Sequence, residues 1–177
     1  RPGMVGMRMT VGGSPGGRMS TSWAAAPPVI CGDRVVFTPH AEPVLHCLDL
    51  YTGRLLWKKD KDSFLYVAGG DGERLLLVAA DSVTAFDLAD GKPAWVHRLG
   101  PTDGRPCGRG VGTQGRFHLP LSSGQICSLD LDDGSVKNRT YLPETSGGGA
   151  VLGNLVMSRG LVLALGPEGL TGYEQRD

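Results

Sequence analysis

The stretch CLDLYTGRLLW, residues 47–57, decides the fold because the chain repeats it. It recurs as AFDLADGKPAW at residues 85–95 and as SLDLDDGSVKN at residues 128–138, and a fourth copy begins with GYE at 172–174. In the first three copies a Gly follows the Asp by four positions, and the first two end on Trp where the third has Asn138. The acidic anchors at 49, 87, 130 and 174 therefore recur every 38 to 44 residues.

Short apolar runs precede each anchor, as in GDRVVF at 32–37 and GERLLL at 72–77. Runs of four to six apolar residues separated by Gly and polar clusters predict short strands, and no window carries a sustained helical stripe. Each unit therefore reads as four strands separated by three turns. One such sheet cannot bury both faces alone, so neighbouring units must cover each other. The predicted fold class is all-β: a partial β-propeller of four-stranded antiparallel blades, about 3.5 to 4 in number.

The repeats divide the chain at approximately 24–62, 63–103, 104–144 and 145–177. Residues 1–23 are rich in Gly and Met and are interpreted as a lead-in or as the remnant of a preceding blade.

The repeated acids and glycines have a local structural interpretation. An Asp carboxylate accepts backbone N–H bonds from the turn that follows it, and Gly adopts positive φ at little steric cost. A Trp on the outer strand can wedge between neighbouring blades. The sequence thus predicts structural turn and docking roles, rather than catalytic ones, for Asp49, Gly53, Trp57, Asp87, Gly91, Trp95, Asp130 and Gly134.

Composition and charge exclude several classes of protein. The 28 Gly and 12 Pro among 177 residues indicate many tight turns. Eighteen basic and eighteen acidic residues cancel, so the chain lacks the surplus of Lys and Arg that a nucleic-acid binder relies on. The longest apolar run, residues 75–80, is far shorter than the roughly 20 residues of a membrane span.

The repeat resembles that of the pyrroloquinoline-quinone-like (PQQ-like, quinoprotein-type) β-propellers, a superfamily that includes quinoprotein alcohol dehydrogenases and BamB-like proteins. The resemblance covers residues 24–177; it is close in the first two copies, weaker in the third, and cut short in the fourth, where Glu174 replaces Asp. Members usually close with seven or eight blades. The chain is therefore expected to be a fragment of a longer bacterial protein, or half of an assembled ring. The alternative is a four-bladed ring in which the segment before Ala24 completes a blade. The family also implies a periplasmic or membrane-associated location.

Enzymes of this family hold the quinone in the central channel with Ca²⁺, and many carry a disulfide between adjacent cysteines. The four cysteines here are far apart in the sequence and define no disulfide framework: Cys31, Cys47, Cys107 and Cys127. Two of them, Cys47 and Cys127, lie in strand-like runs, where we expect them to act as small apolar residues. The four histidines, His40, His46, His97 and His118, are far apart, and their spacing gives no support to a zinc site. No catalytic, cofactor-binding or metal-binding residue is predicted; PQQ and calcium belong to the alternative in which the site residues lie in missing blades.

The favoured function is a non-catalytic scaffold or protein-binding module, and the alternative is part of a PQQ- and Ca²⁺-dependent quinoprotein dehydrogenase. In a propeller the turn between the second and third strands and the blade-to-blade loop share one face, and loops carry most contacts. These loops form either a partner-binding rim or ordinary solvated turns. The candidate rim residues are His40, Glu42, Asp81, Arg105, Arg109, Ser122, Ser123 and Glu168.

Overall fold

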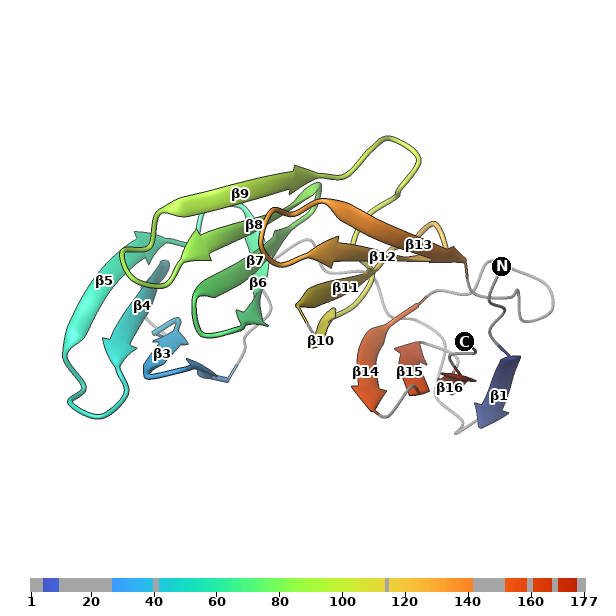
Figure 1. Cartoon of the computed structure of the whole chain (residues 1–177), viewed down its shortest axis with the longest axis horizontal. Coiled ribbons are helices and arrows are strands. Elements are labelled where there is room, and N and C mark those ends of the chain that lie inside the picture. Colours follow the sequence, from blue (N-terminus) through green and yellow to red (C-terminus); the bar gives the residue numbers. More distant parts are fainter. Residues whose placement is uncertain are drawn as a thin grey trace. The chain divides into compact units, whose positions relative to one another are not determined.

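Figure 1 shows the computed structural model, which describes residues 5–9, 27–39, 42–113, 115–141, 152–158, 161–166 and 169–174. The chain divides into two compact units. Unit 1 comprises Arg1–Met19, Leu99–Asp130 and Ser135–Asp177, and unit 2 comprises Ser20–Arg98 and Leu131–Gly134. Each unit is described by itself below. The described residues include no helix with the length and apolarity that crossing a bilayer requires.

Unit 2 holds two antiparallel sheets, each formed by four strands in chain order. The first contains β2 (Val29–Cys31), β3 (Arg34–Phe37), β4 (Val44–Asp49) and β5 (Leu55–Asp60). The second contains β6 (Phe64–Gly70), β7 (Arg74–Ala79), β8 (Ser82–Asp87) and β9 (Pro93–Arg98). A shared core lies between them, in which Val36, Leu45 and Cys47 pack with Leu75 and Leu77.

Unit 1 holds the other two sheets. One contains β10 (Val111–Thr113), β11 (Arg116–Pro120), β12 (Gln125–Asp130) and β13 (Val136–Tyr141). The other contains β14 (Asn154–Ser158), β15 (Leu161–Gly166), β16 (Gly169–Glu174) and β1 (Val5–Met9), in the order β1-β16-β15-β14. Ile126 packs with Leu152, Leu155, Val162 and Tyr173 in the core that these two sheets share.

β1 comes from residues 1–23, which the sequence analysis interpreted as a lead-in or as the remnant of a preceding blade. β1 pairs antiparallel with β16 from Val5↔Glu174 to Met9↔Leu170, so a strand from the start of the chain completes the fourth sheet. The repeat pattern does not predict the strand β1, because β1 carries neither the Asp anchor nor the Trp. Its backbone completes the ladder of β16, which would otherwise be an unpaired edge.

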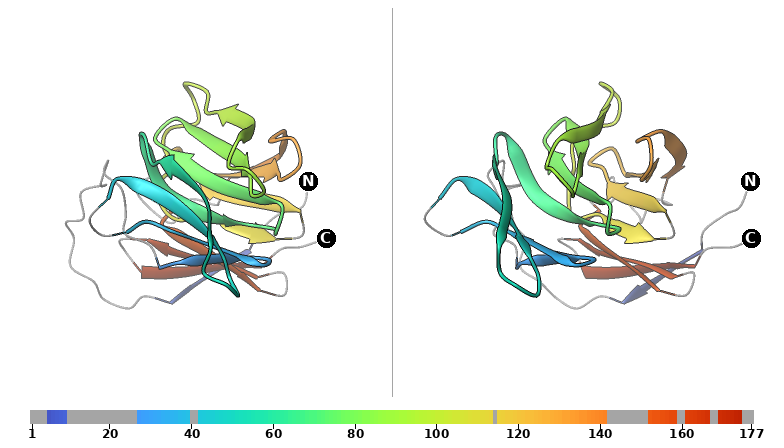
Figure 2. Two further views of the ribbon diagram at one scale, coloured as in Figure 1. Left: turned by 90° about the vertical axis from the view of Figure 1, so that its left-hand side faces the viewer. Right: turned by 60° about the vertical axis from the view of Figure 1, so that its left-hand side comes forward.

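The predicted fold class is confirmed: the described residues form antiparallel four-stranded sheets of the β-propeller type and no helix (Figures 1 and 2). The first three sheets share one irregularity just before the anchor acid. Their outer ladders shift register between Cys47 and Leu48, between Ala85 and Phe86, and between Ser128 and Leu129. Each bulge places one extra residue on the outer strand and increases the local twist.

Candidate functional site

The first repeat turn is organised by the carboxylate of Asp49. Its Oδ1 accepts hydrogen bonds from the backbone N–H of Thr52 at 2.8 Å, from the Thr52 hydroxyl at 2.7 Å and from the N–H of Tyr51 at 3.1 Å. The bonds from Thr52 are the largest cause of the lowered pKa of Asp49. Gly53, at φ +68°, closes the turn by donating its N–H to the Asp49 carbonyl at 2.9 Å.

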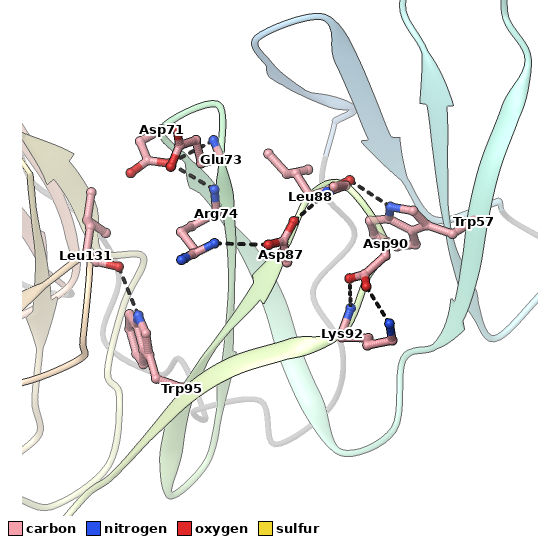
Figure 3. A network of polar contacts seen from close by, with 11 residues as sticks. Trp57, Asp71, Glu73, Arg74, Asp87, Leu88, Asp90, Lys92, Trp95 and Leu131 are labelled. Atoms are coloured by element: carbon pink, nitrogen blue, oxygen red, sulfur yellow. Dashed lines mark hydrogen bonds and ion pairs between the residues drawn. The ribbon is translucent and has the colours of Figure 1, made fainter.

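The second repeat keeps this turn and adds an ion pair (Figure 3). Asp87 Oδ1 accepts the Ala89 N–H at 2.7 Å, and Asp87 Oδ2 lies 3.2 Å from Arg74 Nη1. Gly91 donates its N–H to the Asp87 carbonyl at 2.8 Å. In the third repeat Lys137 Nζ lies 3.2 Å from Asp130 Oδ2. The carboxylates of Asp49 and Asp87 therefore hold the turns that follow them.

The two tryptophans each bind the turn of the next repeat. Trp57 donates its indole N–H to the Leu88 carbonyl at 2.9 Å, and Trp95 donates its own to the Leu131 carbonyl at 2.9 Å (Figure 3). Both rings are only partly exposed. Each Trp thus anchors the turn that follows the next anchor acid.

The turn glycines have a second role that sequence reasoning missed. A Cβ added to Gly91 would lie 2.9 Å from Cδ2 of Trp57, and one added to Gly134 would lie 2.5 Å from Cε3 of Trp95. A Cβ added to Gly53 would meet nothing within 4 Å. Gly91 and Gly134 therefore leave space for an indole ring, in addition to adopting a left-handed backbone conformation. The detectable signal was that both follow a repeat ending on Trp.

In the third repeat, polar side chains occupy the positions that lie beside the Trp in the first two repeats. His118 Nδ1 lies 2.8 Å from Ser128 Oγ, and His118 Nε2 lies 2.9 Å from Thr113 Oγ1. Burial, and then the charge of Arg116, lower the pKa of His118. Both ring nitrogens of His118 therefore have hydrogen-bonding partners. Sequence reasoning missed that it stands beside Asn138 and Ser128 in one cross-strand row.

A buried carboxylate lies beside this repeat. Asp103, which is 4% exposed, forms a two-point ion pair with Arg139, in which Nη2 lies 3.2 Å from Oδ2 and Nη1 contacts Oδ1. Asp103 Oδ2 also accepts the Gly100 N–H at 2.7 Å. The pair joins the 99–110 loop to the outer strand β13. Nothing in the repeat pattern marked Asp103, because it lies in the loop between copies.

The structure brings together some of the candidate rim residues. Ser122 donates its N–H to the Arg105 carbonyl at 2.8 Å, and its hydroxyl accepts the Arg105 N–H at 2.9 Å. Arg109 donates its N–H to Asn154 Oδ1 at 2.8 Å instead. These residues and Ser123 belong to unit 1, whereas Glu42 and Asp81 belong to unit 2. His40 and Glu168 lie outside the described residues.

The described residues do not gather a metal-binding group. Among them, no three His, Cys, Asp or Glu side chains converge in a way that could hold a metal ion. A Cβ added to Gly108 would lie 2.1 Å from the carbonyl carbon of Gly153, so the two backbones approach closely there.

The four cysteines are free. Cys47 and Cys127 are fully buried, as expected of small apolar residues in strands. Burial is the main cause that raises the pKa of Cys31 to about 11 and that of Cys107 to about 12. At neutral pH these thiols are protonated, which removes the thiolate that nucleophilic chemistry needs.

Comparison with known proteins supports the β-propeller fold. A family model described as outer membrane protein assembly factor BamB matches residues 8–176. The crystal structure of BamB from Moraxella catarrhalis is similar at a TM-score of 0.63 and 17% identity, over 84% of this chain and 42% of that one. The chain thus spans less than half the length of that relative.

Two further solved structures are similar. The computationally designed Ika4 protein matches at a TM-score of 0.60 and 14% identity, over 92% of this chain and 99% of that one. A europium-containing methanol dehydrogenase matches at 0.51 and 14% identity, over 64% of this chain and 24% of that one. Identities this low show a common fold alone. No curated protein sequence matches the chain.

Proposed function

Since the chain belongs to the family of outer membrane protein assembly factor BamB, we propose that it is a non-catalytic β-propeller scaffold that binds a protein partner through its loops. We further propose that it works outside the cytoplasm, in the periplasm or at a membrane. Family membership supports both statements. Loops on a rigid sheet scaffold suffice for recognition.

The observation that carries this proposal is the fixed geometry of the loop formed by residues 99–110. The reciprocal hydrogen bonds between Ser122 and Arg105 tie this loop to the β11–β12 turn. Cys107 adds a further backbone bond, from its N–H to the Pro120 carbonyl at 3.1 Å. Arg105, Ser122 and Ser123 remain exposed. A loop already held in one conformation loses little entropy when a partner binds.

Unit 2 presents a comparable surface at the β3–β4 turn. Glu42 Oε2 lies 3.2 Å from His46 Nε2 and 3.8 Å from Lys58 Nζ. The N–H of Lys61, in the loop between β5 and β6, donates to the Pro43 carbonyl at 3.1 Å. The turn and the blade-to-blade loop are therefore neighbours here too. Mixed charge at an exposed site gives specificity and association rate more than raw affinity.

Site-specific photo-crosslinking tests the proposal. A photoreactive amino acid is placed at Ser123 or at Asp81, with Tyr51 as the matched control. Tyr51 is 84% exposed and lies in the β4–β5 turn, at the other end of the strands from the candidate rim. We expect a discrete crosslinked protein from Ser123 or Asp81 and none from Tyr51. Equal crosslinking from all three positions, or none from any, contradicts a binding role for the rim.

A separate titration addresses the quinoprotein alternative. PQQ and Ca²⁺ are added together while the quinone absorption is recorded, followed by an assay for dye-linked oxidation of alcohols or sugars. We expect no saturable spectral change and no oxidation. Saturable binding accompanied by oxidation would overturn the non-catalytic assignment.

A further inference from the structure

The first three sheets carry the same cross-strand row on one face, and the third fills it with different chemistry. The row runs from the second strand through the third to the outer strand and ends at the Trp position. Its members are Val36, Cys47 and Trp57 in the first sheet, Leu76, Ala85 and Trp95 in the second, and His118, Ser128 and Asn138 in the third. All three positions change together, from apolar to hydrogen-bonding.

A cavity lies beside Asn138 in unit 1, between the sheet of β10–β13 and the strands β14 and β15. It has a volume of about 60 Å³. Its polar wall is made by Arg116, His118, Ser128, Asn138 and Thr140. The opposite wall is apolar, with Leu155, Met157 and Val162. Asn138 and Arg116 are exposed, whereas Ser128 is buried, so the cavity is open to solvent at one end and closed at the other.

The polar wall is rich in hydrogen-bond donors and carries positive charge. Arg116 brings a permanent guanidinium, and none of the cavity-lining residues is acidic. Asp130, which pairs with Arg116 across the ladder, has its carboxylate bound by Lys137 at 3.2 Å. Asn138 Nδ2 donates to Thr140 Oγ1 at 3.1 Å, which leaves the Thr140 hydroxyl proton to donate to another acceptor.

His118 adds polarity without a second charge. Its two ring nitrogens bond the hydroxyls of Ser128 and Thr113, and in the neutral ring one nitrogen donates while the other accepts. The lowered pKa of His118 keeps the ring neutral at pH 7. The fixed charge at the mouth therefore comes from Arg116.

We propose that this cavity binds a carboxylate group, with Arg116 as its ionic partner and with Asn138 and Thr140 as additional donors. The size fits: a single water needs roughly 10–15 Å³ by the same kind of measure, so the cavity holds a group of a few heavy atoms. It is far smaller than the roughly 300–1,000 Å³ of sites for cofactors and drug-sized molecules. The apolar wall accommodates the short carbon chain that carries the carboxylate.

Titration with sodium acetate tests the proposal, using sodium chloride at equal ionic strength as the reference. Nuclear magnetic resonance follows the His118 ring and the Asn138 side-chain amide at pH 7.5. We expect saturable shifts of both signals with acetate but not with chloride. In Arg116→Gln we expect an affinity at least about tenfold weaker, because a charge-assisted bond is lost. The matched control Arg54→Gln changes an exposed arginine in unit 2 and should bind acetate normally.

Shifts that do not saturate, that chloride reproduces, or that saturate with unchanged affinity in Arg116→Gln overturn the proposal. A second variant, Asn138→Trp, restores the residue of the first two repeats and should fill the cavity. It is expected to abolish acetate binding while leaving a cooperative unfolding transition. If Asn138→Trp does not fold, the pair Arg116→Gln and Arg54→Gln still decides the outcome.

The carboxylate could belong to a small free acid or to an acidic side chain of a partner segment. A blocked tripeptide, Ac-Ala-Asp-Ala-amide, is therefore compared with acetate. Binding of both points to an acidic side chain, and binding of acetate alone points to a small free acid. Failure of the tripeptide leaves the binding role of the rim untouched, because that role is tested by crosslinking at Ser123 and Asp81.

Discussion

The second and third repeats have the same strand pairing and the same bulge before the anchor acid, yet they fill the row beside it in opposite ways. In the second, Leu76 and Ala85 lie beside Trp95, which seats its ring on Gly134. In the third, His118 and Ser128 lie beside Asn138 and line a cavity. The backbone ladder therefore does not require the Trp. The Trp fills the space beside this row with an apolar ring. Where the Trp is absent, polar side chains line that space on the same backbone.

The largest expected effect separates the two outer-strand residues. Trp95→Ala should lower the free energy of unfolding by about 3 kcal/mol, because it removes a large aromatic contact and leaves the Leu131 carbonyl without its indole donor. Asn138→Ala should cost about 0.5 kcal/mol, as for most exposed positions. Urea denaturation of both variants measures the difference. Equal losses would mean that the two repeats depend on this position to the same degree.

The turn glycines sharpen the comparison next. Gly53→Ala and Gly134→Ala both place a side chain at positive φ, +68° and +72°, so they share the same backbone strain. Only the Cβ at Gly134 meets an indole ring. Gly134→Ala should therefore be less stable than Gly53→Ala by about 2 kcal/mol, the range for an overpacked site. Thermal unfolding of the matched pair checks this, and indistinguishable midpoints would contradict the seat assigned to Gly134.

A third difference lies one position further along the outer strand. Val96 of the second repeat is 52% exposed, whereas Arg139 of the third holds the buried carboxylate of Asp103. Arg139→Ala should cost about 2 kcal/mol because it leaves a buried charge with fewer partners. Val96→Ala should cost about 0.5 kcal/mol. The comparison fails if the two variants have the same denaturation midpoint.

The smallest effect is a pH dependence confined to the third repeat. The pKa of His118 is lowered in the folded protein, first by burial and then by Arg116. Unfolding therefore takes up a proton, so this residue's contribution to stability is present above pH 6.5, its ordinary pKa, and is lost as the pH falls below that value. The variant His118→Gln keeps a hydrogen-bonding side chain but does not titrate. In a buffer without carboxylates, its stability should fall less than that of the parent chain between pH 7.5 and 5.

The repeat was sufficient to predict the first three sheets, because it records local requirements. Asp49 and Gly53 form their turn through bonds between residues at most four apart, and such turns can be read from sequence. The docking role of Trp57 also followed, since a large aromatic side chain on an outer strand needs apolar cover. The binding role of the rim stays a prediction, although Ser122 and Arg105 do lie together.

Other features escaped because their partners are far apart in the chain. Asp103 and Arg139 are 36 residues apart. The strand β1 reaches β16 across almost the whole sequence, with Val5 opposite Glu174. No local pattern records such pairings. The cavity is likewise lined by residues of two sheets, and only one of these two sheets belongs to the repeat that has Asn138 in place of the Trp.

The amino-acid sequence by itself determined the strand period, the turn acids and the left-handed glycines, because strand alternation and turn hydrogen bonds act over a few residues. Tertiary structure decided which glycine seats an indole, which arginine neutralises a buried acid, and where a cavity lies beside Asn138. These depend on what packs against a residue, and packing joins atoms that the chain brings together only when it folds.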